Sequence, residues 1–281
     1  MYQKAVSDFL IFVKKCFPEH VSGFPCLSYQ VTYYIAFLSQ SGLGVSTIKS
    51  RISALNYVHK LCGGSDLYHD FILKKCLIGL AKSHATIDMR LPITLPILIQ
   101  LCRSLCKLYS NSYFIALMHA MFSLAFVAFL RVGEITKTGS SYNPNLLCIH
   151  NISVCSNPPS LNVSFQHYKH KTPGPPFTLT VTDLPQMPVV QFILTYIKLR
   201  GPAPGPLFLY KGVPVTRNLF VQTLNSCLKF LNLNHLPYKS HSFRIGAASY
   251  AISNGVSYDK VKIMGRWKSD ALAKYIRVNA M

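Results

Sequence analysis

The last 41 residues of the sequence hold side chains that could act together on a phosphodiester. His241 and Arg244 are three residues apart, Gly265-Arg266-Trp267 follows them, and Tyr275 stands eight residues after Trp267. A guanidinium can bind two phosphate oxygens at once, and a tyrosine hydroxyl can form a covalent intermediate. A cation, an imidazole and a phenol that converge on one point would therefore suit chemistry on a phosphodiester.

Two predicted helices would have to position these residues. The small and apolar spacing from Ser242 to Ser253 predicts a helix that Asn254-Gly255 ends. His241 and Arg244 would share its first turn and point the same way. Ser269 and Asp270 are good N-cap residues, so the sequence predicts a second, short helix that contains Tyr275.

The order and spacing of these residues resemble the tyrosine recombinase family, which includes phage integrases and the Xer-type and Cre-type recombinases. The resemblance is strongest to the branch carried by eukaryotic mobile elements of the DIRS, Ngaro and Crypton types, which share the Gly-Arg-Trp spacing. Bacterial members usually place their His or Trp nine residues before the tyrosine, whereas the gap here is eight. The resemblance implies that His241, Arg244, Trp267 and Tyr275 are catalytic, with Tyr275 as the nucleophile.

A further arginine, Arg131, follows an apolar segment that predicts a helix over 112–130. An arginine that emerges from such a helix is costly to bury without partners, and Glu134 stands three residues later. From the residues alone, this pair could tie down the helix end, or Glu134 could hold a phosphate-binding Arg131. The resemblance favours the second interpretation, because the family's first catalytic arginine stands in the same Arg-x-Gly-Glu setting.

Residues 146–182 change to a period of two, which predicts a small antiparallel sheet. Its middle hairpin carries the basic run from Gln166 to Lys171, which could equally be a solvated turn. In the family this hairpin carries a lysine that protonates the leaving 5′ oxygen. Lys169 best fits that position at the end of the second strand, and Lys171 remains the alternative.

Composition limits the classes of protein that the chain can belong to. Half of the 281 residues are hydrophobic, and 29 Lys and Arg against 9 Asp and Glu give a formal net charge of +20. Such a chain folds, and its charge favours nucleic acid or an anionic membrane surface as partner, although charge alone does not exclude a ribosome-associated or simply soluble basic protein. The nine cysteines lack CxxC pairs and are expected to be free thiols, and no metal site is expected. The longest apolar run, 115–130, is too short for a membrane span, so no membrane partner is expected.

The N-terminal part predicts four helices with scattered basic residues. We therefore expect a mainly α-helical, two-domain chain: a helical bundle over 1–84, and a second domain over 90–281 that contains the small antiparallel sheet. From the residues alone, the N-terminal charges could be a solvated surface. The resemblance implies a SAM-like core-binding domain that grips DNA, followed by the catalytic domain. The DNA-binding candidates are Lys49, Arg51, Lys60, Lys74 and Lys75.

The resemblance implies a site-specific recombinase or integrase of a mobile element that cleaves and rejoins double-stranded DNA through a 3′-phosphotyrosine intermediate. It implies a metal-independent reaction without a cofactor, a homotetramer assembled on DNA, and a nuclear or otherwise intracellular location. Two alternatives stay open: a domesticated copy that binds DNA without catalysis, and a type IB topoisomerase that relaxes DNA by the same chemistry. Strand exchange that is lost in Tyr275→Phe would exclude the first alternative. Relaxation of DNA without recombinant products would indicate the second.

Overall fold

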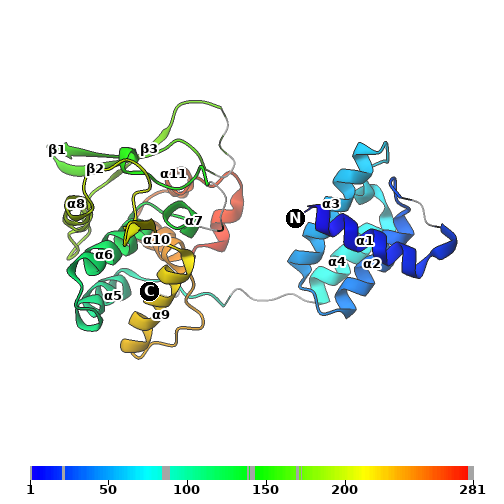
Figure 1. Ribbon diagram of the computed structural model, residues 1–281, viewed down its shortest axis with the longest axis horizontal. Coiled ribbons are helices and arrows are strands. Elements are labelled where there is room, and N and C mark those ends of the chain that lie inside the picture. Colours follow the sequence, from blue (N-terminus) through cyan, green and yellow to red (C-terminus); the bar gives the residue numbers. More distant parts are fainter. Residues whose placement is uncertain are drawn as a thin grey trace. The chain divides into compact units, whose positions relative to one another are not determined.

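The computed structural model describes residues 2–20, 23–83, 89–137, 139, 143–168, 171 and 173–277. The chain forms two compact units, Met1–Asp88 and Met89–Met281, each with a hydrophobic core of its own (Figure 1). Both units are mainly helical, and the second contains a small antiparallel sheet, so the predicted fold class is confirmed. Among the described residues, no helix has the length and apolar character needed to cross a bilayer.

The first unit is a bundle of four helices, the number that the sequence predicted. Helix α1 packs against α3, and α2 packs against α3 and α4, so that their apolar stripes meet in one core. Asp70 begins the last helix, because its Oδ1 accepts a hydrogen bond from the backbone N–H of Leu73 at 2.8 Å. The helices are α1 (Tyr2–Cys16), α2 (Ser28–Gln40), α3 (Val45–Leu61) and α4 (Phe71–Ser83), with the 3-10 turns η1 (Pro18–His20) and η2 (Leu67–His69).

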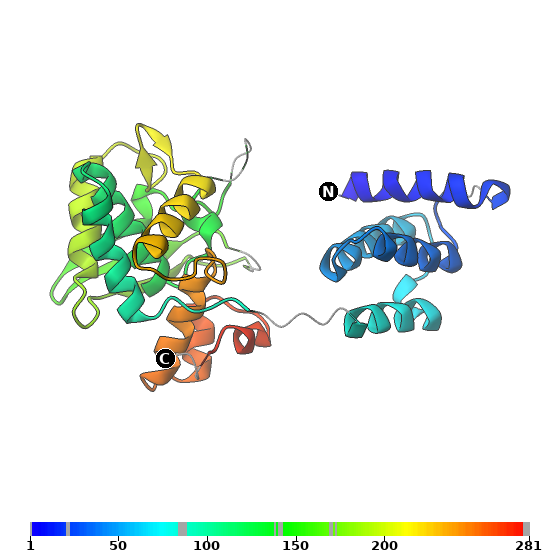
Figure 2. The same cartoon turned by 90° about the horizontal axis from the view of Figure 1, so that it is seen from below.

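The second unit is built around helix α6, which is apolar on nearly all sides. It packs against α5, α8 and α10, and these helices bury it almost completely (Figures 1 and 2). A helix without a polar face must lie inside a domain. The longer helices of this unit are α5 (Leu95–Leu108), α6 (Ser112–Val127), α8 (Val189–Arg200), α9 (Arg217–Phe230) and α10 (Ser242–Ser253).

Three antiparallel strands in the order β1-β2-β3 form the sheet of the second unit, and β2 packs against α8. The strands are β1 (Ile152–Ser156), β2 (Pro159–Phe165) and β3 (Phe177–Val181), with Phe165 opposite Phe177 at the hairpin end of the β2–β3 pair. The sequence pattern of period two, which predicts strands, begins at Leu147. In the structure the first strand, β1, starts later, after the 3-10 turn η3 (Ile149–Asn151). A two-stranded ribbon, β4 (Leu209–Tyr210) with β5 (Val213–Pro214), precedes α9.

Two of the predicted helix boundaries are wrong, and both lie next to the candidate site. The helix predicted over 112–130 ends at Val127, because Phe129 adopts a left-handed φ of 50°. A separate short helix, α7 (Val132–Ile135), then begins with Arg131 as its N-cap. Tyr275 does not lie within a helix either. It follows the 3-10 helix η4 (Asp270–Lys274) as the C-cap, and its N–H donates to the carbonyl of Leu272 at 2.7 Å.

Candidate active site

The site is built on the ends of two helices that stop in the same way. At the end of α6, Phe129 and Leu130 donate backbone hydrogen bonds to the carbonyls of Phe126 and Ala125. The end of α11 (Tyr258–Met264) repeats this pattern with Arg266 and Trp267 as donors. This pairing is the Schellman motif, which usually places glycine at the left-handed position. Here that position holds Phe129 in one helix end and Arg266, with a φ of 57°, in the other.

Arg244, in the first turn of α10, joins these two helix ends. Its side chain is fully buried, and its two terminal nitrogens donate to the carbonyls of Phe129 and Gly265. The guanidinium lies over the ring of Trp267, with Cζ 3.9 Å from the ring centroid. Burial and, after it, the positive charges of Arg131 and Arg266 lower the pKa of Arg244 to about 9, so the group stays charged at neutral pH.

The structure brings four of the predicted residues together. The ring of Tyr275 lies 5.2 Å from the ring of Trp267 and 6.3 Å from that of His241, centroid to centroid. The Cζ of Arg244 is 5.7 Å from the ring centroid of Tyr275. Trp267 and Tyr275 are eight residues apart, and the segment between them contains the 3-10 helix η4, after which the Tyr275 ring lies against that of Trp267.

His241 is a neutral imidazole among cations. Burial lowers its pKa to about 4, and the positive charges of Arg90, Arg244, Arg217 and Arg131 contribute in that order. Its Nδ1 is buried without a hydrogen-bond partner among the described residues. We did not predict Arg90 and Arg217 as neighbours of His241. Nothing in the local sequence of either arginine indicates this proximity.

Arg131 and Glu134 form the ion pair that the sequence suggested. As N-cap of α7, Arg131 donates its backbone N–H to Glu134 Oε2 at 2.9 Å and its Nη1 to Glu134 Oε1 at 3.1 Å. The Glu134 side chain is 3% exposed, whereas that of Arg131 is 23% exposed. The two interpretations offered by the sequence are therefore compatible: the pair fixes the start of α7, and part of Arg131 still reaches solvent.

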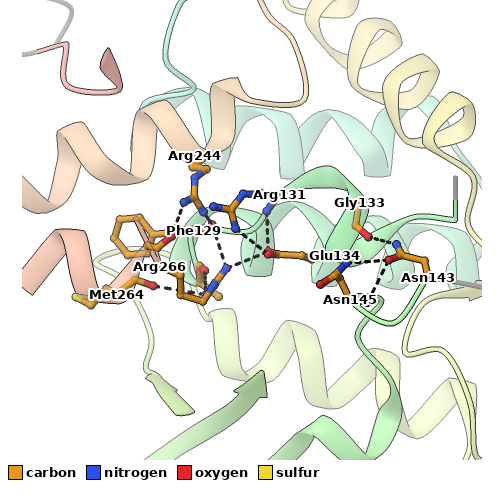
Figure 3. A network of polar contacts seen from close by, with 11 residues as sticks. Phe129, Arg131, Gly133, Glu134, Asn143, Asn145, Arg244, Met264 and Arg266 are labelled. Atoms are coloured by element: carbon orange, nitrogen blue, oxygen red, sulfur yellow. Dashed lines mark hydrogen bonds and ion pairs between the residues drawn. The ribbon is translucent and has the colours of Figure 1, made fainter. Parts of the chain in front are cut away.

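Arg266 is a member of the site that we did not predict. Its buried side chain donates from Nη2 to Glu134 Oε2 at 2.9 Å, and it also contacts the carbonyls of Ala128 and Phe129. Its guanidinium lies over the ring of Phe165, with Cζ 3.8 Å from the centroid. Figure 3 shows the result, a continuous polar network that runs from Arg131 through Glu134 and Arg266 to the Phe129 carbonyl and Arg244. The only sequence signal was the position of Arg266 between Gly265 and Trp267.

The hairpin between β2 and β3 is only partly described. Lys169 lies outside the described residues. Lys171 is described, and its Nζ donates to the carbonyl of Gln166 at 2.6 Å, across the base of the hairpin. Within the described part of the chain, no three His, Cys, Asp or Glu side chains gather where they could hold a metal ion.

The five basic residues predicted to bind DNA in the first unit differ in their surroundings. Lys49, Lys74 and Lys75 are exposed, and the ammonium of Lys75 lies over the ring of Phe71. Lys60 is paired with Asp66 at 3.2 Å. Arg51 is engaged inside the bundle, because its Nη1 donates to Asp8 at 2.8 Å and to the Tyr34 hydroxyl at 3.1 Å.

The described fold is that of the tyrosine recombinases. No family model matches the chain, and no curated protein matches it in sequence. Among solved structures it resembles the XerH site-specific recombinase bound to a palindromic difH substrate, with a TM-score of 0.67 and 12% identity over 97% of this chain and 74% of that one. It also resembles the Tn1549 transposon integrase in complex with transposon right end DNA, with a TM-score of 0.60 and 12% identity over 100% and 91% of the two chains. A lambda integrase dimer bound to a core site gives a TM-score of 0.54 and 10% identity over 98% and 72%.

Proposed function

We propose that this chain is a site-specific DNA recombinase that cleaves and rejoins DNA through a covalent bond between Tyr275 and a 3′ phosphate. The observation that carries the proposal is the cluster of Tyr275, His241, Trp267 and Arg244, linked by hydrogen bonds to Arg131. The likeness of the fold to recombinases solved with DNA adds support.

The first step is an in-line attack of the Tyr275 hydroxyl on the scissile phosphorus. The new bond joins the tyrosine oxygen to phosphorus, the bond from phosphorus to the 5′ oxygen breaks, and the phenolic proton passes to His241. In the free protein the pKa of His241 is lowered to about 4 by burial and by nearby arginines, so the imidazole is neutral and can accept a proton. A bound phosphate would offset that positive charge and make the imidazole more basic.

Arg131 and Arg244 would stabilise the two non-bridging oxygens as negative charge develops in the pentacoordinate state. Arg244 is held rigidly by two carbonyls, yet its Nε is buried without a partner among the described residues. A buried polar atom without a partner is costly, and a phosphate oxygen would satisfy it. The indole N–H of Trp267 is a further donor for a phosphate oxygen.

A lysine of the β2–β3 hairpin would protonate the leaving 5′ oxygen, with Lys169 as first candidate and Lys171 as second. Rejoining is the reverse reaction, in which a 5′ hydroxyl attacks the phosphotyrosine and frees Tyr275. Two guanidiniums supply the positive charge, so the reaction is expected to proceed without a metal or other cofactor.

We place the activity in a mobile element, because the Gly-Arg-Trp spacing before Tyr275 resembles the DIRS, Ngaro and Crypton branch. The substrate would be double-stranded DNA gripped by both units, with Lys49, Lys74 and Lys75 among the contacts of the first. A homotetramer on paired sites and a nuclear location follow from such an activity.

The test is covalent trapping on nicked duplexes tiled across the DNA that flanks the gene. Wild-type protein and Tyr275→Phe are incubated with these duplexes without divalent metal, denatured and separated on a gel. We expect a shifted, protease-sensitive DNA adduct with wild type and none with Tyr275→Phe. Tyr258→Phe, at the start of α11, serves as a matched control and should form the adduct.

Three outcomes would overturn the proposal. DNA binding without any adduct would favour a non-catalytic DNA-binding protein. An equal adduct in Tyr275→Phe would place the nucleophile elsewhere. Adducts that lead to relaxed plasmid but never to recombinant products would favour a topoisomerase.

A further inference from the structure

We propose that Arg266 is a positioning residue for Arg131 and for the base of the β2–β3 hairpin, a role that rests on the proposed function. Arg266 touches both parts at once: its guanidinium bonds Glu134 on one side and covers the ring of Phe165 at the end of β2. No other described side chain joins these two regions through an ion pair and a ring contact.

The backbone at Arg266 is the first argument. The position after the C-cap of α11 requires a left-handed φ, which glycine adopts without strain and arginine adopts at a cost. Gly265, one residue earlier, does not occupy the left-handed position. An arginine in place of glycine is consistent with a side chain that the site needs, since strained residues concentrate at functional sites.

The charge on Glu134 is the second argument. Glu134 is nearly fully buried and accepts hydrogen bonds from both Arg131 and Arg266. Because Arg266 occupies Oε2, Glu134 Oε1 alone binds the Arg131 guanidinium, through Nη1. Within the described ranges, the Arg131 guanidinium makes no second hydrogen bond to Glu134. Without Arg266, the buried carboxylate would draw the Arg131 guanidinium inward and away from a phosphate.

The contact with the sheet is the third argument. Phe165 is the last residue of β2, and Gln166, whose carbonyl accepts a hydrogen bond from Lys171, follows it directly. A guanidinium over an aromatic face contributes more when it is desolvated, as it is here. Arg266 therefore couples the hairpin that would supply the general acid to the arginine that would bind the phosphate.

The experiment measures the single-turnover rate of adduct formation and the DNA dissociation constant for Arg266→Gly and Arg266→Lys. Arg266→Gly suits the backbone and removes the side chain, whereas Arg266→Lys keeps the charge and loses the planar fork. For Arg266→Gly we expect a rate about 100-fold lower, because a displacement of about 1 Å can cost that much, with a dissociation constant changed less than about threefold. Arg266→Lys is expected to fall between wild type and Arg266→Gly. Arg200→Lys is the matched control, an arginine that binds backbone carbonyls at the end of α8, and its rate should not change.

A second substrate separates positioning from a loss of folded protein. A duplex with a methyl group in place of one non-bridging oxygen of the scissile phosphate lacks the charge that Arg131 would stabilise. The loss caused by either variant should shrink about tenfold on this duplex, whereas a folding defect would give the same loss on both. Equal losses on both duplexes, or an unchanged rate in both variants, would overturn the inference while the proposed function stands. No adduct from wild type on the unmodified duplex would overturn both.

Discussion

At the scale of single residues, the site concentrates positive charge around one carboxylate. Arg131 and Arg266 both pair with Glu134, whereas the buried Arg244 donates to the carbonyls of Phe129 and Gly265. The excess positive charge affects His241. Its pKa is lowered mainly by burial and, to a smaller extent, by the surrounding arginines. A site with this excess of cations is suited to an anion.

The lowered pKa of His241 predicts how the stability of the second unit depends on pH. The unfolded imidazole binds a proton near its ordinary pKa of about 6.5, whereas the folded one binds it only near 4. Between these values the unfolded state holds more protons, so the free energy of unfolding falls as pH falls from about 6.5 to 4. Calorimetric unfolding across this range should show a decrease in Tm that is smaller in His241→Gln.

His150→Gln, a substitution of an exposed histidine in η3, is the control for this prediction. It should keep the wild-type dependence of Tm on pH. If His241→Gln lost as much Tm between pH 6.5 and 4 as wild type does, the lowered pKa would not be the cause.

Residue types and spacing were enough to select Arg131, Glu134, His241, Arg244, Trp267 and Tyr275 as one set, and the structure gathers these residues in one region. They were not enough to select Arg266. Its partner Glu134 is 132 residues away in the sequence, and Phe165 belongs to a strand. A role defined by two such distant contacts leaves no local pattern.

At the scale of elements, the site depends on how α6 and α11 end. The sequence predicted the span of α10, Ser242 to Ser253, correctly, because small and apolar spacing and the Asn254-Gly255 stop mark it. It failed at the end of α6, where Phe129 adopts the left-handed conformation without a glycine to indicate it. It also placed Tyr275 inside a helix, because N-cap residues predict where a short helix begins and not whether it is a 3-10 turn.

The end of α11 gives a second prediction. A Cβ at Gly265 would lie 1.6 Å from the ring of Trp267, which is held between Arg244 and Tyr275 and cannot move freely. Gly265→Ala should therefore destabilise the second unit by about 1–3 kcal/mol, as overpacking does. It should also lower the rate of adduct formation, because the Trp267 ring must leave the Arg244 guanidinium. Urea unfolding and single-turnover cleavage measure the two effects.

Gly133→Ala is the matched control for Gly265→Ala. Gly133 lies in α7 beside Arg131, and a Cβ there would meet nothing within 4 Å. Its free energy of unfolding should change by no more than the helix preference of alanine over glycine, about 1 kcal/mol in the stabilising direction. Equal destabilisation by both substitutions would contradict the steric explanation.

At the scale of the whole molecule, charge is divided unevenly between the two units. Residues 1–88 contain nine Lys and Arg against five Asp and Glu, a net charge of +4, whereas residues 89–281 contain twenty against four, a net charge of +16. The mainly helical class could be predicted from the apolar periodicity of the sequence. The engagement of particular charges could not, because Arg51 and Lys74 have the same kind of local sequence and different partners in space.

This difference between Arg51 and Lys74 predicts distinct effects on DNA binding. The double substitution Lys74→Gln and Lys75→Gln should reduce the slope of log affinity against log salt by about 1.8, the contribution of two phosphate contacts. Arg51→Gln should leave that slope nearly unchanged and should instead lower the stability of the first unit, because its guanidinium binds Asp8 and Tyr34. Fluorescence anisotropy at several salt concentrations and thermal unfolding distinguish these outcomes. A larger change of slope in Arg51→Gln would contradict the assignment.

The position of Trp267 has a consequence for observing the reaction. It is the only tryptophan in the chain, its indole lies on the Arg244 guanidinium, and the Tyr275 ring touches its edge. All of the indole emission therefore originates beside the proposed nucleophile, and a neighbouring cation and phenol modulate it. When Tyr275 turns toward a phosphate and becomes esterified, both the quenching and the energy transfer between the two rings change. The unlabelled protein thus contains its own optical probe, which could resolve DNA docking, cleavage and religation in real time by stopped flow.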